Sequence, residues 1–178
     1  MMTARNKRIV FQGFALALEE MEVKMGSRGW HSYQVIRHPG GVGVLPVHDD
    51  GKVSLVRQLR PALATSLLEL PAGRLKPGED PSICGLRELA EETGLIAGRL
   101  DSLGSVHPSP GVSDEITHLF VATELTQGSA FPESYEDIEV VTIPLEDAVQ
   151  MAMNGSISDG KTTIALFRAA ARRKNHNP

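Results

Sequence analysis

The chain has 178 residues, of which 41% are hydrophobic and 22% charged, so it suits one globular domain with a small appendage and excludes a disordered or collagen-like chain. Its 18 basic and 22 acidic residues leave a net charge of −4, which argues against a nucleic-acid backbone as the main partner. No apolar run is long enough to span a membrane. The single cysteine, Cys84, cannot form an intramolecular disulfide, which fits a reducing compartment such as the cytoplasm.

Residues 1–38 are expected to form a small β-strand appendage. The apolar stretch Ile9–Leu18 follows basic residues as in a signal peptide, but Gln12 and Gly13 interrupt it, so we interpret it as a strand. Strict alternation of apolar and charged residues predicts a second strand near residues 20–25, and residues 30–38 resemble a third. So few strands are marginally stable alone, and we expect the appendage to pack on the main domain or on another chain.

Residues 39–178 are expected to form the main domain, which belongs to the α+β class with a mixed sheet because strands, one helix, more strands and then helices follow in that order. Asp49-Asp50-Gly51 predicts a hairpin between the first two strands of this domain. The predicted strands are 42–47, 53–59, 67–70, 100–106, 117–123 and 138–143, and the last two predicted helices are 145–153 and 161–173.

The first predicted helix begins at Pro81, with Asp80 as its N-cap, and ends at Gly94, which can adopt the left-handed conformation. Its buried stripe is expected to consist of Ile83, Leu86, Leu89 and Ala90. The same helix places Glu88 and Glu92 one turn apart on one face, with Glu91 beside them. A solvated acidic face would explain these three residues, and so would a bound Mg²⁺ or Mn²⁺ that offsets their repulsion.

The spacing of the whole segment adds weight to the metal-binding interpretation, because it matches the Nudix box, G-x5-E-x7-R-E-U-x-E-E-x-G-U, in which U is aliphatic. Its nine defined positions are filled by Gly73, Glu79, Arg87, Glu88, Leu89, Glu91, Glu92, Gly94 and Leu95. A chance match at all nine has a probability on the order of 10⁻⁷, so the chain resembles the Nudix hydrolases. The resemblance implies a Nudix-type α/β/α sandwich that binds a divalent metal and hydrolyses a nucleoside diphosphate linked to another moiety.

Several box residues are expected to have supporting roles. Gly73 and Gly78 would let the backbone turn between strand and helix. Arg87 is placed to orient Glu91 and Glu79 through ion pairs. Glu79, which precedes the helix, can support the loop or a metal-bound water.

Since the other box residues are assigned supporting roles, Glu88 and Glu92 are the expected direct metal ligands, and Glu91 lies at the border of the same face. By resemblance, the backbone carbonyl of Ala72 is a further ligand, because such enzymes use the backbone just before the box. The expected cofactor is therefore Mg²⁺, with Mn²⁺ as a possible substitute.

Features outside the box are similar to the ADP-ribose pyrophosphatase branch. They are the upstream segment 56–61, the entry segment 69–73, and Pro110, which lies 15 residues after Leu95. This resemblance implies Mg²⁺-dependent hydrolysis of ADP-ribose to AMP and ribose 5-phosphate. It also implies that residues 1–38 take part in an intertwined homodimer.

The branch takes its water-activating carboxylate from the loop after the box, and Glu115 is the residue at that place. Ser113-Asp114-Glu115 could instead cap a turn, in which case Glu92 or Glu91 would be the base.

The remaining candidates are substrate contacts. Arg60 matches an arginine that family members direct at the phosphates, and its alternative is a charge at a strand end. Trp30 and Tyr33 could stack on adenine across a dimer interface, or simply pack in the appendage. Ser109 and Gly111 flank the marker proline and complete the expected substrate-binding set.

Two other functions stay open. A hydrolase of another nucleoside diphosphate sugar, such as GDP-mannose, would use the same box. A non-catalytic module that senses ADP-ribose is a different class, but such modules usually lose box glutamates, and this chain keeps all four.

Overall fold

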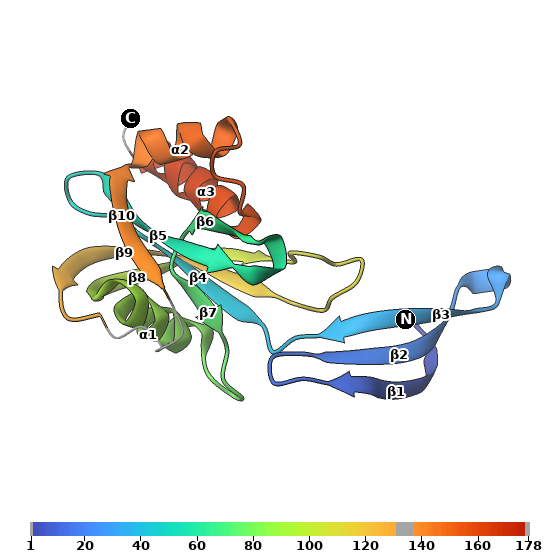
Figure 1. Ribbon diagram of the computed structural model, residues 1–178. Helices are drawn as coiled ribbons and strands as arrows, with labels where there is room; N and C mark the ends of the chain where they lie inside the picture. The colour runs from blue at the N-terminus through green and yellow to red at the C-terminus, as the bar shows by residue number, and fades with distance from the viewer. Residues whose placement is uncertain (1, 131–136, 177–178) are drawn as a thin grey trace.

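The computed structural model describes residues 2–130 and 137–176, which form a main body and an appended N-terminal sheet (Figure 1). The strands are β1 (Ala4–Gln12), β2 (Ala17–Lys24), β3 (Trp30–Arg37), β4 (Gly41–Pro46), β5 (Lys52–Arg60), β6 (Thr65–Glu69), β7 (Ala72–Arg74), β8 (Leu95–Val106), β9 (Thr117–Gln127) and β10 (Ile138–Pro144). The helices are α1 (Pro81–Thr93), α2 (Leu145–Met153) and α3 (Gly160–His176). The α+β class with a mixed sheet is confirmed.

The N-terminal sheet is antiparallel, in the order β1-β2-β3, and extends to one side of the main body (Figure 1). The prediction of one strand over residues 9–18 was wrong, because a turn interrupts it. Gly13 donates its N–H to the carbonyl of Leu16 at 2.9 Å, and this turn separates β1 from β2. The alternation in β2 is confirmed by Met21 and Val23, whose side chains are buried on one face.

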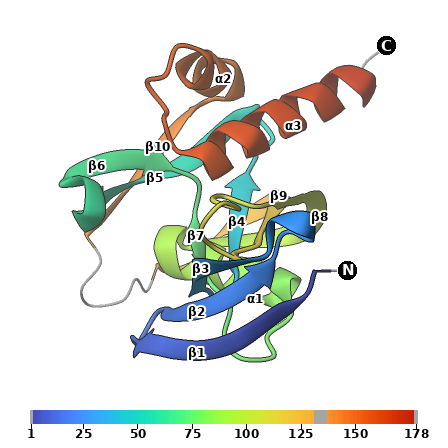
Figure 2. The same cartoon turned by 90° about the vertical axis from the view of Figure 1, so that its right-hand side faces the viewer.

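The main body contains a mixed sheet in the order β7-β4-β9-β8, in which β4 and β9 are parallel and the other neighbours antiparallel. Every residue of β4 is buried, as expected for a strand covered on both faces. Val42 and Val44 belong to the core cluster beneath α1, whereas Leu45 belongs to the cluster beneath α2 and α3. The sheet therefore lies between two helical layers, which Figure 2 shows on opposite sides of it.

A second, antiparallel sheet has the order β10-β5-β6. The hairpin predicted at Asp49-Asp50-Gly51 forms only at its turn. A single bridge joins Val47 to Val53, and beyond it β4 and β5 enter different sheets. Each strand already has neighbours on both edges, β4 between β7 and β9 and β5 between β10 and β6, so neither has a free edge for the other.

Helix α1 packs on the mixed sheet through a face that includes Leu89 of the predicted stripe but excludes Ile83 and Leu86. Ile83 is 62% exposed and Leu86 41% exposed, and the buried residues are Cys84, Gly85, Leu89, Glu92 and Thr93. Small residues allow a close approach, since a Cβ placed on Gly85 would lie 3.1 Å from a methyl group of Val44. With this face of α1 on the sheet, the side chain of Glu92 lies toward β7.

Candidate active site

Helix α1 begins and ends at the expected residues. The carboxylate of Asp80 accepts the N–H of Ser82 at 2.8 Å, and Pro81 follows in the first turn. Gly94 has φ 72° and donates its N–H to the carbonyl of Ala90 at 2.9 Å. Local capping therefore sets the ends of the helix that carries the acidic residues.

Arg87 holds three glutamates of the box together. Its Nε donates to Glu79 at 3.0 Å, and its Nη1 donates to Glu88 at 2.7 Å and to Glu91 at 2.9 Å. The expected pairs with Glu79 and Glu91 are present, and the pair with Glu88 is an addition. The Arg87 guanidinium lowers the pKa of Glu79 to about 2, so this carboxylate stays ionised at neutral pH.

Gly73 has a steric role that the sequence did not indicate. It lies in β7 with no positive φ, so of the two glycines expected to let the backbone turn, only Gly78 has a positive φ, of +74°. A Cβ on Gly73 would lie 1.9 Å from the carboxyl carbon of Glu88. Glycine thus leaves the space that the Glu88 carboxylate occupies against the strand.

Glu92 faces the same edge of β7. Its side chain is buried, with 4% of the residue exposed, and its Oε2 accepts the N–H of Ala72 at 3.2 Å. The expected ligands Glu88, Glu92 and Ala72 therefore meet where α1 contacts β7, while the expected border ligand Glu91 is more exposed and pairs with Arg87.

The oxygen donors where α1 contacts β7 fit a divalent cation. Three box carboxylates pair with the Arg87 guanidinium, and the fourth, Glu92, lies against Ala72, so negative charge is in excess. Hard oxygen donors are those that Mg²⁺ and Mn²⁺ prefer. Within residues 2–130 and 137–176, no three His, Cys, Asp or Glu side chains converge as a ready metal site. Arg87 holds one oxygen each of Glu88 and Glu91 on its Nη1.

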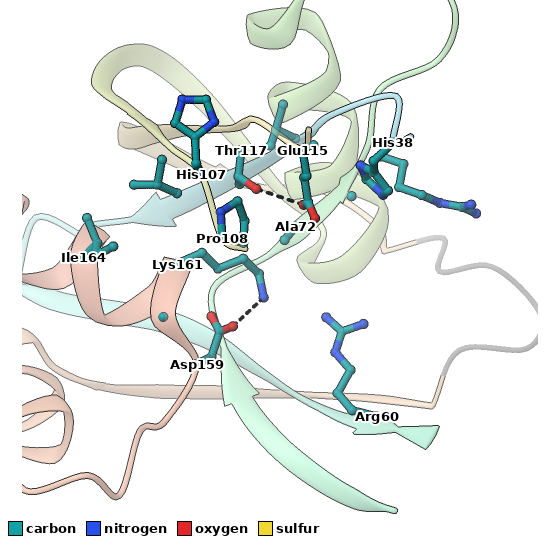
Figure 3. A pocket seen from close by; sticks show the side chains of 16 residues that line it. His38, Arg60, Ala72, His107, Pro108, Glu115, Thr117, Asp159, Lys161 and Ile164 are labelled. Atoms are coloured by element: carbon teal, nitrogen blue, oxygen red, sulfur yellow. Dashed lines mark hydrogen bonds and ion pairs between the residues drawn. The ribbon is translucent and has the colours of Figure 1, made fainter. Parts of the chain in front are cut away.

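A cleft of about 460 Å³ opens beside the contact between α1 and β7 (Figure 3). It is lined by His38, Gly41, Val42, Arg60, Ala72, Gly73, Arg74, Val106, His107, Pro108, Glu115, Thr117, Asp159, Gly160, Lys161 and Ile164. Glu115 points into it from the loop before β9, and its Oε1 accepts the hydroxyl of Thr117 at 3.1 Å. The loop carboxylate and the Ala72–Gly73 edge of β7 thus share one cleft.

Two cations on the opposite wall share a buried carboxylate. Arg60 binds Glu69 through two hydrogen bonds of 2.6 and 2.8 Å, and Lys161 pairs with both Glu69 and Asp159. Glu69 is 1% exposed, and although burial raises its pKa, Arg60 and Lys161 outweigh burial and hold that pKa below its ordinary value. Arg60 lines the cleft, and its two hydrogen bonds to Glu69 set the orientation of its guanidinium.

Sequence reasoning missed Lys161, Asp159 and Glu69. A signal was present in Asp159-Gly160-Lys161-Thr162, because Asp159 caps α3 by accepting the N–H of Thr162 at 2.9 Å. The cap places Lys161 in the first turn of the helix, where a cation opposes the helix dipole. A lysine at such a position indicates a carboxylate partner or an anionic ligand.

Four expected substrate residues lie away from the cleft. Ser109 and Gly111 are exposed in the loop before β9 and are absent from the cleft lining that the described residues form. Trp30 lies on β3 with the Arg5 guanidinium 4.1 Å from the centre of its ring, and Tyr33 lines a separate hollow on the N-terminal sheet. Within one chain, neither aromatic ring reaches the cleft.

Residues 37–166 match the NUDIX domain family. This chain belongs to the Nudix family. The match covers most of the main body, including α1 with its glutamates and the Glu115 loop. Together with the relatives below, it places the chain among the Nudix hydrolases, in the ADP-ribose pyrophosphatase-like branch. Nudix hydrolases generally use divalent metal cations, in agreement with the donors at α1.

Relatives cover most of this Nudix chain. An ADP-ribose pyrophosphatase of Bacillus subtilis is 38% identical over 90% of this chain and 88% of its own length. A methanol dehydrogenase activator of Bacillus methanolicus is 36% identical over 88% of this chain and 86% of its own. A GDP-mannose pyrophosphatase of Salmonella arizonae is 34% identical over 76% of each chain.

The fold also has a solved counterpart. The crystal structure of an ADP compounds hydrolase superposes with a TM-score of 0.86, at 21% identity, over 99% of this chain and 96% of that one. This likeness confirms the Nudix-type fold. Among the described residues, no helix is long and apolar enough to cross a membrane.

Proposed function

We propose that this Nudix hydrolase cleaves the pyrophosphate bond of ADP-ribose, with Mg²⁺ as cofactor, to give AMP and ribose 5-phosphate. One observation carries the proposal: Glu115 enters the same cleft as the Ala72–Gly73 edge, with Arg60 and Lys161 opposite. The ADP-ribose pyrophosphatase that is 38% identical over 90% of this chain supports the choice of substrate.

The chain supplies charge on both sides of the bond to be broken. Glu88, Glu92 and the carbonyl of Ala72 would hold the divalent ion, which when bound neutralises phosphate charge and stabilises the charge that develops at phosphorus. Mn²⁺ has similar ligand preferences and would be expected to substitute. Arg60 and Lys161 would bind phosphate oxygens from the opposite wall, where Glu69 holds both side chains in place.

Glu115 is the proposed base. It would take the proton of a water whose oxygen attacks one phosphorus, while the bridging P–O bond breaks and its electrons go to the leaving phosphate. Its hydrogen bond to Thr117 orients the carboxylate, and its place on a loop leaves it adjustable when substrate enters. Glu91 and Glu92 are the alternatives, but Glu91 is paired with Arg87 and Glu92 is buried against Ala72.

The N-terminal sheet is proposed to join two copies of the chain into a homodimer. It exposes an unusual set of large apolar side chains, Ile9, Val10, Phe11, Phe14 and Leu16. Phe14 is 98% exposed at the turn between β1 and β2. Such a dimer is also the arrangement in which Trp30 and Tyr33 of one copy could approach the cleft of the other.

Hydrolysis of GDP-mannose is the second candidate, and the GDP-mannose pyrophosphatase relative at 34% identity favours it. Both reactions would use the same carboxylates, so the site at α1 does not separate them. The ratio of kcat/KM for ADP-ribose to that for GDP-mannose decides between the two.

A Glu115→Gln variant tests the proposed mechanism. We expect kcat for ADP-ribose to fall about 10²–10⁴-fold, the usual contribution of a general base, while Mn²⁺ affinity measured by calorimetry stays unchanged. Glu124→Gln, on the exposed part of β9, is a matched control. A Glu115→Gln enzyme as active as its parent would remove Glu115 from the mechanism.

A further inference from the structure

The loop that carries Glu115 is held by the last residues of the N-terminal sheet. Ile36, near the end of β3, donates its N–H to the carbonyl of Val112 at 2.8 Å and accepts the N–H of Asp114 at 3.2 Å. These bonds form a parallel bridge between Ile36 and Ser113. The loop between β8 and β9 therefore continues the N-terminal sheet at one point, immediately before Glu115.

The side chains reinforce this bridge. Nη1 of Arg37 donates to Oδ2 of Asp114 at 2.9 Å, and the backbone N–H of His38 donates to Oδ1 of the same carboxylate, also at 2.9 Å. Nε of Arg37 donates to Glu19 on β2 at 2.6 Å. Both oxygens of Asp114 are thus engaged, and Arg37 in turn is anchored to a second strand.

The consequence concerns the residue that follows. Glu115 is joined to Asp114 by one peptide bond, so a fixed Asp114 limits the positions that the Glu115 backbone can take. The N–H of Glu115 is also bonded, to the hydroxyl of Ser113 at 3.1 Å. Residues 107–112 of the loop are exposed. The bridge and the Arg37–Asp114 pair hold the chain just before Glu115, and the N–H of Gly41 donates to the carbonyl of Ile116 at 2.9 Å just after it.

We propose that Arg37 and Asp114 are positioning residues that hold Glu115 in the cleft, and that through them the N-terminal sheet contributes to turnover. This inference rests on the proposed role of Glu115. It assigns the appended sheet a function within each chain, separate from any part in a dimer.

The alternative is a purely structural ion pair. Arg37 and Asp114 have side chains that are 34% and 41% exposed, and pairs of that kind contribute little to the free energy of unfolding. A positioning role predicts a different signature: a loss of kcat that is large compared with the loss of stability, because a displacement of about 1 Å can cost about 10²-fold in rate.

A double-mutant cycle with Glu115 tests the inference. We expect Asp114→Ala to lower kcat for ADP-ribose about 10²-fold with KM nearly unchanged. Asp114→Asn should lose less, because its side-chain oxygen can still accept the N–H of His38. Added to Glu115→Gln, Asp114→Ala should cost no more than about twofold further, since it acts through Glu115. A full additional loss in the Glu115→Gln background would overturn the proposal.

Hydrogen exchange, measured on the whole protein, tests the inference without an activity assay. Arg37→Met should speed exchange in residues 107–116, whereas Arg37→Lys should restore part of the protection. Arg99→Met, which removes an exposed pair with Asp101 at 2.7 Å on β8, is the matched control. Unchanged exchange in Arg37→Met would overturn the inference. Absence of turnover in the parent enzyme would instead contradict the proposed function.

Discussion

A Cβ atom on Gly73 would lie 1.9 Å from the carboxyl carbon of Glu88. We therefore expect Gly73→Ala to force the Glu88 side chain away from β7. The protein should fold, because the overlap involves the end of a flexible side chain, at a cost of about 1–3 kcal/mol in the free energy of unfolding. Activity should fall about 10²-fold or more, since a displacement of about 1 Å can have that effect.

The control for this variant is Gly85→Ala on α1, the helix that carries Glu88. A Cβ there would lie 3.1 Å from Val44 in the core and would not touch the acidic cluster. We expect Gly85→Ala to change thermal stability and leave kcat per folded molecule intact. Equal loss of activity in both variants would show that helix packing, and not the space beside Glu88, is what Gly73 protects.

Glu88→Gln and Glu92→Gln should each remove most of the activity with little loss of stability. Each exchange keeps the shape of the side chain and removes the charge that would bind the cation. Turnover at several Mg²⁺ concentrations and the thermal midpoint are the measurements. If either variant keeps turnover near that of the parent, its assignment as a metal ligand is wrong.

Glu69 predicts a pH dependence of stability. Its pKa is lowered in the folded protein, so its contribution to the free energy of unfolding is present above the unfolded value near 4.5 and is lost as the pH falls through the lower, folded pKa. Glu69→Gln should therefore lose about 1–3 kcal/mol at pH 7, because Arg60 and Lys161 lose a charged partner. It should also depend less on pH below 4.5 than its parent, as measured by urea unfolding.

The matched control is Glu139→Gln, because Glu139 pairs with Arg57 on the surface of the same sheet. Exposed pairs contribute little, so its free energy of unfolding should change by less than about 1 kcal/mol. If Glu69→Gln were as stable at pH 7 and as sensitive to acid as the parent, the buried carboxylate would have no such role.

Lys161 is expected to act in substrate binding. Lys161→Met should raise KM for ADP-ribose about 10-fold or more, the usual cost of a hydrogen bond to a charged group, with a smaller effect on kcat. Lys52→Met, which removes an exposed pair with Asp50 at 2.7 Å, is the control. An unchanged KM would mean that Lys161 serves only to neutralise Glu69 and Asp159.

Local features of the site could be read from the sequence, because their causes are local. Asp80, Pro81 and Gly94 set the ends of α1 by their own backbone chemistry, and helical spacing brought Arg87 and Glu91 together. The Nudix box added the partner from outside the helix, Glu79. Each of these predictions concerns residues that lie close together in the sequence.

Features that depend on distant contacts could not be read in this way. Lys161 and Glu69 are 92 residues apart, and only the fold brings them together. The buried face of α1 was mispredicted because periodicity favoured Ile83 and Leu86, whereas close packing on Val44 selected Gly85. Tertiary packing decides which face of an amphipathic helix is covered when small and large apolar residues compete.

The most direct test of the central claim is turnover of a substrate panel by the parent enzyme with Mg²⁺ and with EDTA. The panel would hold ADP-ribose, GDP-mannose, UDP-glucose, NADH, diadenosine polyphosphates and 8-oxo-dGTP. We predict Mg²⁺-dependent release of AMP and ribose 5-phosphate from ADP-ribose, with a kcat/KM above that of every other compound. A higher kcat/KM for GDP-mannose would contradict the proposed substrate, and binding of ADP-ribose without turnover of any compound would contradict the catalytic function itself.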